Sequence, residues 1–224
     1  MKSRFRVALF AVPVLLGLAA FTFVGSRCAA YVSPDEDSEK KDKVILETMM
    51  RILRHTHYSP TDIDDDFSHQ AFDMYLERND YNKKIFLQAD YDELKNKYYN
   101  DIEDQVKVQD FTFFNRTVEI LSKRIAEDKR VYTAVLAKPF DFTVTESVEL
   151  DPEKVAYAKD TVERAEVWRK YLKYQVMARF VELQKANKKE VDAKKAGVTL
   201  KSDVDLEKEA RDKVRKTQDD IFDR

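Results

Sequence analysis

The stretch FNRTVEILSKRIAEDKRVYTAV, Phe114 to Val135, decides the class of fold that this sequence predicts. Its apolar residues recur every three or four positions, as they do along the buried face of an α-helix. They are Phe114, Val118, Leu121, Ile125, Tyr132 and Val135. The pattern stops at Lys138-Pro139, because proline lacks a backbone donor and disfavours helical geometry in the residue before it. The sequence therefore predicts one long, half-buried helix here.

Several other segments show the same spacing and predict an all-α bundle of about five to six helices. We expect helices over about 42–55 and 66–78, from Tyr91 to Ile102, from the Asp151-Pro152-Glu153 opening onward, and from about Val204. Proline and acidic residues are favoured in the first turn of a helix, so a helix is predicted to begin at Asp151-Pro152-Glu153. The lysine-rich segment from Asn187 to Asp205 predicts an exposed connector. Trp168, the single tryptophan, lies on a stripe with Ala165 and Leu172 and is predicted to anchor the core.

The segment KPFDFTVTESVELD, residues 138–151, departs from this pattern because its apolar residues recur at nearly every second position. It predicts one short extended ribbon near 140–150. No other segment supplies a sheet for it to join, and an open strand with two exposed phenylalanines would invite aggregation. We therefore expect Phe140, Phe142 and Val144 to pack on the helices. The other interpretation is a docking strand for a partner.

The N-terminus predicts export. A basic start precedes an apolar run at 7–25, and Cys28-Ala29-Ala30 places a cleavage site before Tyr31, so residues 1–30 are interpreted as a signal peptide. Residues 7–25 also reach the length of an uncleaved membrane anchor. A lipoprotein attached through Cys28 is disfavoured by the arginine before it. Residues 31–41 are predicted to be a polar tether, and 42–224 the helical domain.

Composition excludes several classes of function. Without residues 1–30 the chain has 36 basic and 42 acidic side chains, so it lacks the basic excess expected of a nucleic-acid-binding protein. Gly197 is then the sole glycine, and phosphate loops, dinucleotide fingerprints and nucleophile elbows all require glycine. We accordingly expect no cofactor.

No catalytic or metal site is predicted. The serines lie outside the turn motifs that expose a nucleophile, and the many lysines have solvated surroundings. His55 and His57 would point apart on a helix, and the acids at 62–66 lack the glycine and distal glutamate of a calcium loop. Helix capping explains those acids better.

Four pieces of the sequence resemble, in order, the N-terminal domain of the exported bacterial tail-specific proteases, also called carboxy-terminal processing proteases. They are HYSP at 57–60, DDDFSHQAFDMYLERND at 64–80, FLQADYDEL at 86–94 and KPFDFTVTESVELDPEKVAYAKDTVERAEVWRKYLKYQ at 138–175. The resemblance spans about residues 42–224.

That resemblance implies an exported, periplasmic protein in which a PDZ-like domain and a serine–lysine protease domain follow the helical arm. If residues 7–25 stay uncleaved, they would tether it to the inner membrane. Both domains would lie beyond Arg224, so no residue here inherits a catalytic role. The arm would help to receive protein or peptide substrates and to dock a helical adaptor protein. The alternative is a free-standing periplasmic interaction or chaperone-like module with no protease attached.

Overall fold

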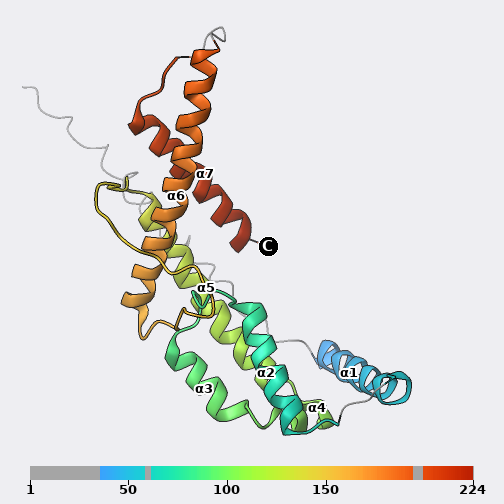
Figure 1. Ribbon diagram of the computed structural model, residues 1–224. Coiled ribbons are helices and arrows are strands. Elements are labelled where there is room, and N and C mark those ends of the chain that lie inside the picture. The colour runs from blue at the N-terminus through green and yellow to red at the C-terminus, as the bar shows by residue number, and fades with distance from the viewer. Residues whose placement is uncertain (1–35, 59–61, 194–198, 224) are drawn as a thin grey trace, which may run out of the picture. The chain divides into compact units, whose positions relative to one another are not determined.

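The computed structural model describes residues 36–58, 62–193 and 199–223 (Figure 1). Those residues form seven α-helices and no strand, which confirms the all-α class. The helices are α1 (Glu36–Thr56), α2 (Asp65–Asn79), α3 (Gln88–Tyr98), α4 (Ile102–Val108), α5 (Thr112–Leu136), α6 (Thr161–Asp192) and α7 (Asp203–Phe222). The predicted signal or anchor at 1–30, with Cys28, lies outside the described residues. Within them, no helix is long and apolar enough to span a membrane.

Side-chain caps set several helix starts. Asp64 accepts a hydrogen bond from Phe67 N before α2, and Ser202 accepts one from Asp205 N before α7. Asp160 accepts from two backbone amides, Val162 N and Glu163 N, and so begins α6. Each cap satisfies amide groups that have no partner within the helix.

Three predicted boundaries were wrong. Asp151-Pro152-Glu153 closes a short turn through a bond from Lys154 N to Asp151 O, and α6 begins only after the Asp160 cap. The helix predicted from Tyr91 to Ile102 is two helices, because the chain breaks between α3 and α4. α1 begins at Glu36, within the segment predicted to be a polar tether.

The C-terminal connector is also shorter than predicted, since α6 continues to Asp192. Asn187 is therefore a helical residue, and it is buried. Its side-chain amide accepts from Lys201 N (2.8 Å) and donates to Thr199 O (3.1 Å). One side chain thus ties the returning chain to α6 just before α7 begins.

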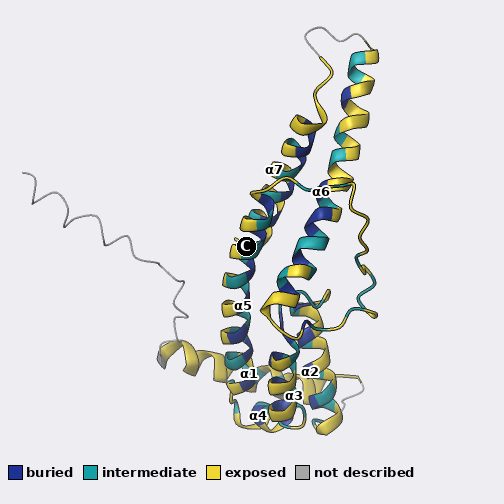
Figure 2. Ribbon diagram, turned by 90° about the vertical axis from the view of Figure 1, so that its left-hand side faces the viewer, coloured by how far each residue is buried: buried dark blue, intermediate teal, exposed yellow. Residues whose placement is uncertain are grey.

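Two apolar cores lie along α5 (Figure 2). The first joins α2, α3, α4 and the N-terminal half of α5 around Phe72, Leu94, Tyr98 and Phe113. The second joins the C-terminal half of α5 to α6 and α7 around Tyr132, Trp168, Leu172, Val176 and Ala210. α6 and α7 run side by side in both views.

The buried face of α5 contains Tyr132, as predicted, but along most of the helix it lies one residue away from the predicted stripe. Its buried positions are Phe113, Thr117, Ile120, Arg124, Asp128, Tyr132 and Leu136. Phe114, the first residue of the predicted stripe, is 49% exposed. Two charged residues, Arg124 and Asp128, therefore occupy buried positions between the two apolar cores.

Candidate functional site

Residues 138–150, called the ribbon below, leave α5 and run beside α6 without regular secondary structure (Figure 1). Phe140 N donates to Glu207 Oε1 on α7 (3.0 Å), and Glu207 is held in turn by Arg211. The Phe140 ring stacks on Phe142, which stacks on Phe180 of α6 at 5.7 Å between centroids. The start of the ribbon is thus packed on both α6 and α7.

The alternation predicted for the ribbon breaks at a turn. Thr143 donates from its backbone N (2.9 Å) and its hydroxyl (2.6 Å) to Asp141 Oδ1. The turn redirects the chain after Phe142, so Val144 does not follow the two rings onto the helices and is 52% exposed. Phe140 and Phe142 are half-buried, as packing requires, whereas Val144 differs from that expectation.

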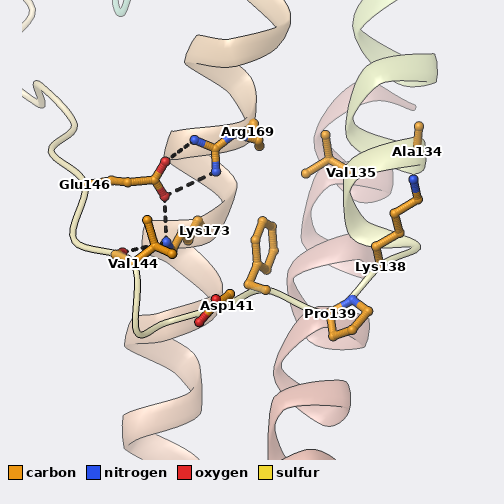
Figure 3. Close-up of a pocket in the computed structure, with 10 residues that line it drawn as sticks. Ala134, Val135, Lys138, Pro139, Asp141, Val144, Glu146, Arg169 and Lys173 are labelled. Carbon is orange, nitrogen blue, oxygen red and sulfur yellow. Dashed lines mark hydrogen bonds and ion pairs between the residues drawn. The ribbon is translucent and has the colours of Figure 1, made fainter.

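Three charged side chains fix the ribbon beyond the turn (Figure 3). Lys173 Nζ on α6 donates to Val144 O (2.9 Å) and to Glu146 Oε2 (2.6 Å). Arg169, one turn earlier, contacts the same carboxylate through both of its Nη atoms. The hydrogen bonds from Arg169 and Lys173 lower the pKa of Glu146 to about 2, so its carboxylate stays ionised near neutral pH. These contacts of Lys173 and Arg169 with Glu146 and Val144 O are called the Lys173 clamp below.

The ribbon leaves a hollow on each side. One, of about 500 Å³, is lined by apolar surface from the end of α5 and from Pro139, Phe140 and Val144, and by the charges of the clamp (Figure 3). The other, of about 290 Å³, lies between residues 142–148 and α6, where Tyr174 and Met177 line it. The two hollows and the ribbon are called the ribbon groove below.

The groove continues as an exposed apolar stripe along α6. Tyr174, Met177 and Val181 are spaced as neighbours on one helix face and are 40%, 41% and 38% exposed. Among the described residues, the backbone of 145–148 has no hydrogen-bond partner. Extended backbone without partners beside an apolar stripe is suited to hold an extended peptide.

Sequence reasoning found only part of this site. The structure places Phe140, Phe142 and Val144 at the groove, but it places Trp168 in the second core, 4% exposed. Lys173, Glu146 and Arg169 were missed. The spacing of Arg169 and Lys173 on one helix face was visible in the sequence, but their shared acid lies more than twenty residues away.

His69 and the acidic segment at 62–66 make contacts that support the fold. His69 Nε2 lies 2.5 Å from Asn100 Oδ1, and its ring stacks on Tyr99. Asp64 caps α2. The described residues hold no group of three or more histidines and acids placed to bind a metal ion.

A second cluster, called the charged layer below, is buried between the two apolar cores. Arg124 makes a paired contact with Asp90 on α3 (2.7 and 2.8 Å) and reaches Glu127 (2.9 Å). Arg164 of α6 donates to the same Glu127 (2.5 Å), and its Nε lies 3.2 Å from Asp128. The layer therefore links α3, α5 and α6.

Asp128 is the least neutralised acid of the charged layer. Its carboxylate is fully buried, and burial raises its pKa to about 7, against the opposing effect of Arg164. The nearby Asp80 and Glu127 act in the same direction as burial. Lys84 of the same region has a pKa lowered to about 8, mainly by burial.

This shift predicts a stability change with pH. Between about pH 4 and pH 7 the folded protein retains a proton on Asp128 that the unfolded chain has lost, so the free energy of unfolding should fall as pH rises. The slope for one proton is at most about 1.4 kcal/mol per pH unit. Lys84 acts only above this window, where its lowered pKa makes stability rise with pH.

Chemical denaturation across this range would test the prediction with Asp128→Asn, which cannot ionise. The free energy of unfolding of the Asp128→Asn protein should change less with pH than that of the parent. Asp220→Asn, at an exposed position on α7, should show the same pH dependence as the parent. Parallel curves for the parent and Asp128→Asn would contradict it.

Comparison with known proteins identifies the family. Residues 49–224 match the tail specific protease N-terminal domain family. The tail-specific protease of Haemophilus influenzae is 31% identical over 116 residues, which are 52% of this chain and 17% of that relative. The matched part is thus less than a fifth of the relative's length. With most of the helical region covered by the family match, the chain belongs to the tail-specific protease N-terminal domain family.

Proposed function

We propose that this chain is the non-catalytic helical arm of an exported, periplasmic serine endopeptidase that processes proteins from their carboxy termini. In this proposal the arm receives substrate polypeptide at the ribbon groove and offers further surface for an adaptor protein. The serine–lysine pair would belong to a part of the enzyme outside this chain. The observation that carries the proposal is the ribbon groove, with its exposed apolar stripe and its backbone without partners.

The groove favours an extended polypeptide over a folded ligand. A peptide aligned with residues 145–148 would gain main-chain hydrogen bonds, which do not depend on sequence. Alternate side chains of such a peptide would reach the apolar surface of Tyr174 and Met177. A protease that acts on many unfolded chains requires this kind of sequence-tolerant contact.

The Lys173 clamp supports that use of the ribbon. It holds Val144 O and Glu146 and so keeps the extended segment in place before a peptide arrives. A segment that is already ordered loses less conformational entropy on binding. The clamp therefore acts as a positioning element for the groove.

We expect the double change Tyr174→Ser and Met177→Ser to weaken binding of a fluorescent, unfolded peptide with an apolar C-terminus about tenfold or more, because it removes the apolar wall. Fluorescence anisotropy measures the affinity. Both residues are partly exposed, so the melting temperature should change little. Val162→Ser, at a 77% exposed site on the same helix, is the control and should bind as the parent does.

The pair Phe140→Ser and Phe142→Ser separates packing from direct contact with the peptide. These half-buried rings stack against each other and on Phe180, so the pair should clearly lower the melting temperature. Unchanged peptide affinity in the Tyr174 and Met177 variant would contradict the proposed site. Unchanged stability with lost affinity in the phenylalanine variant would make the ribbon itself the docking strand.

A further inference from the structure

α1 carries an apolar face that is largely exposed in the described part of the chain; one edge of it, at Met50 and Leu53, borders a hollow shared with Ile63 and Phe67. Ile45, Met49, Ile52 and Leu53 lie on one side of this helix and are 45%, 55%, 53% and 47% exposed. The spacing of these four residues in the sequence is that of one helix face. Figure 2 colours α1 as exposed along most of its length. An exposed apolar helix face of this size marks a site of interaction with a protein or a membrane.

The width of the face argues against a second helix as the partner at this site. Leu46 and Met50, which are half-exposed, extend the face on one side, so six of the nine residues from 45 to 53 are apolar. At 100° per residue these six cover an arc of roughly 160°. A two-stranded coiled coil uses a narrower seam of alternate third and fourth residues. A broad face is better matched to a broad apolar surface.

The charges of α1 are suited to an anionic surface. Over the whole of α1 five basic residues balance five acidic ones, but from Lys43 to Arg54, the part that carries the apolar face, three basic residues accompany one acid. Lys41 and Lys43 border the two edges of the apolar arc, where long side chains can keep their ammonium groups at the level of headgroups. Arg54 lies beside Lys43 at one edge, and Arg51 lies on the opposite side. The acids Glu36, Asp37 and Glu39 are confined to the start of the helix, which carries the positive end of its dipole.

The sequence before α1 would keep this helix close to a membrane in which residues 7–25 are anchored. Ten residues, 26–35, separate α1 from the apolar run at 7–25, and ten extended residues span at most about 35 Å. Wherever that run is held in a bilayer, α1 stays close to the headgroups, and the high effective concentration favours a weak contact. A cleaved chain would retain the same helix face for reversible binding.

We propose that α1 lies in the interface of a membrane rich in anionic phospholipid, with Ile45, Met49 and Ile52 inserted among the acyl chains. Burial of these side chains supplies most of the affinity, and Lys41, Lys43 and Arg54, near the two edges of the face, contact the headgroups. α1 would thereby hold the helical domain at the membrane surface, a role distinct from the ribbon groove.

The test uses the full chain with Cys28→Ser and one new cysteine, either Met49→Cys on the face or Glu47→Cys on the opposite side, labelled with an environment-sensitive fluorophore. With vesicles of phosphatidylglycerol and phosphatidylcholine, the label at 49 should shift to the blue and be quenched by nitroxide lipids. The label at 47 should not. Vesicles of phosphatidylcholine alone should give a weaker signal at 49.

A matched pair of variants makes the test specific for the face. Ile45→Ser with Ile52→Ser should weaken vesicle partitioning of the label at 49 on the order of tenfold or more. Val44→Ser, at a 61% exposed position away from the face, should leave it unchanged. A label at 49 that stays in water while residues 7–25 hold the chain on vesicles would overturn the proposal. So would a blue shift without vesicles that grows with protein concentration, since it would indicate a second copy of the chain.

Discussion

Replacing Arg164 with alanine should lower the free energy of unfolding by roughly 3–5 kcal/mol, the usual cost of removing one member of a buried ion pair. Arg164 is 2% exposed and faces two acids, Glu127 and Asp128, while its Nη1 donates to Ile85 O (2.8 Å). Without the guanidinium, both carboxylates and one carbonyl lose a partner inside the protein. Asp128 would then be buried without a cationic partner, while Glu127 would keep Arg124.

Urea denaturation monitored by circular dichroism measures this effect, and Arg169→Ala is its matched control. Arg169 lies on the same helix and also pairs with two acids, Glu146 and Glu166, but its side chain is 32% exposed. Ion pairs in contact with solvent contribute about 0–1 kcal/mol, so this variant should stay close to the parent. Equal losses for the two arginines would show that burial of Arg164 is not what makes it important.

The triple change Arg164→Met, Glu127→Gln and Asp128→Asn examines the reason for that loss. It removes the charge of the arginine and of both acids together, so no buried charge is left without its partner. It should recover much of the stability lost in Arg164→Ala, because replacing a buried ionic cluster by neutral groups is often neutral or stabilising. A triple variant less stable than Arg164→Ala would mean that the layer stabilises the fold through its ionic contacts themselves.

The charged layer also marks the limit of what the sequence could predict. Periodicity identified α5 correctly as a long helix and Tyr132 as one of its buried residues, but it considered only apolar residues and so missed the buried Arg124 and Asp128. Arg124 and Asp128 are buried because their partners come from α3 and α6, 34 and 36 residues away along the chain. A pattern within one helix contains no information about such partners.

The predicted start of α6 was wrong for a related reason. The predicted start of α6 was Asp151-Pro152-Glu153, but the structure begins the helix after Asp160, whose carboxylate accepts from two backbone amides. Asp151 caps a turn instead. The residues after Asp151 are also held elsewhere, since Lys83 Nζ donates to Val155 O and Gln88 N donates to Ala158 O. These tertiary contacts keep residues 155–158 out of the helix.

Trp168→Ala should cost roughly 3–5 kcal/mol of folding free energy, the range for removing a large aromatic side chain from a core. Trp168 is 4% exposed, and its ring lies 5.8 Å from Phe222 of α7 and 6.1 Å from Tyr171, centroid to centroid. Truncation leaves a cavity where α6 meets α7. It also removes the aromatic face beside Lys84 Nζ, which lies 5.6 Å from the indole centroid.

The position of Trp168 makes this loss larger than that of other aromatic residues on the same helix. Tyr174→Ala, at a 40% exposed site, removes a ring of comparable size that lines the ribbon groove, and should change the midpoint of unfolding little. Circular dichroism is the suitable measurement, since the variant loses the single tryptophan and with it the intrinsic fluorescence signal. A Trp168→Ala protein that melts within a degree or two of the parent would mean that the other contacts of the second core, such as Leu172, Val176 and Ala210, are enough to hold α6 and α7 together. Because α7 returns along α6 and packs there around this ring, we expect the opposite: the C-terminal helix should become the first part of the domain to unfold.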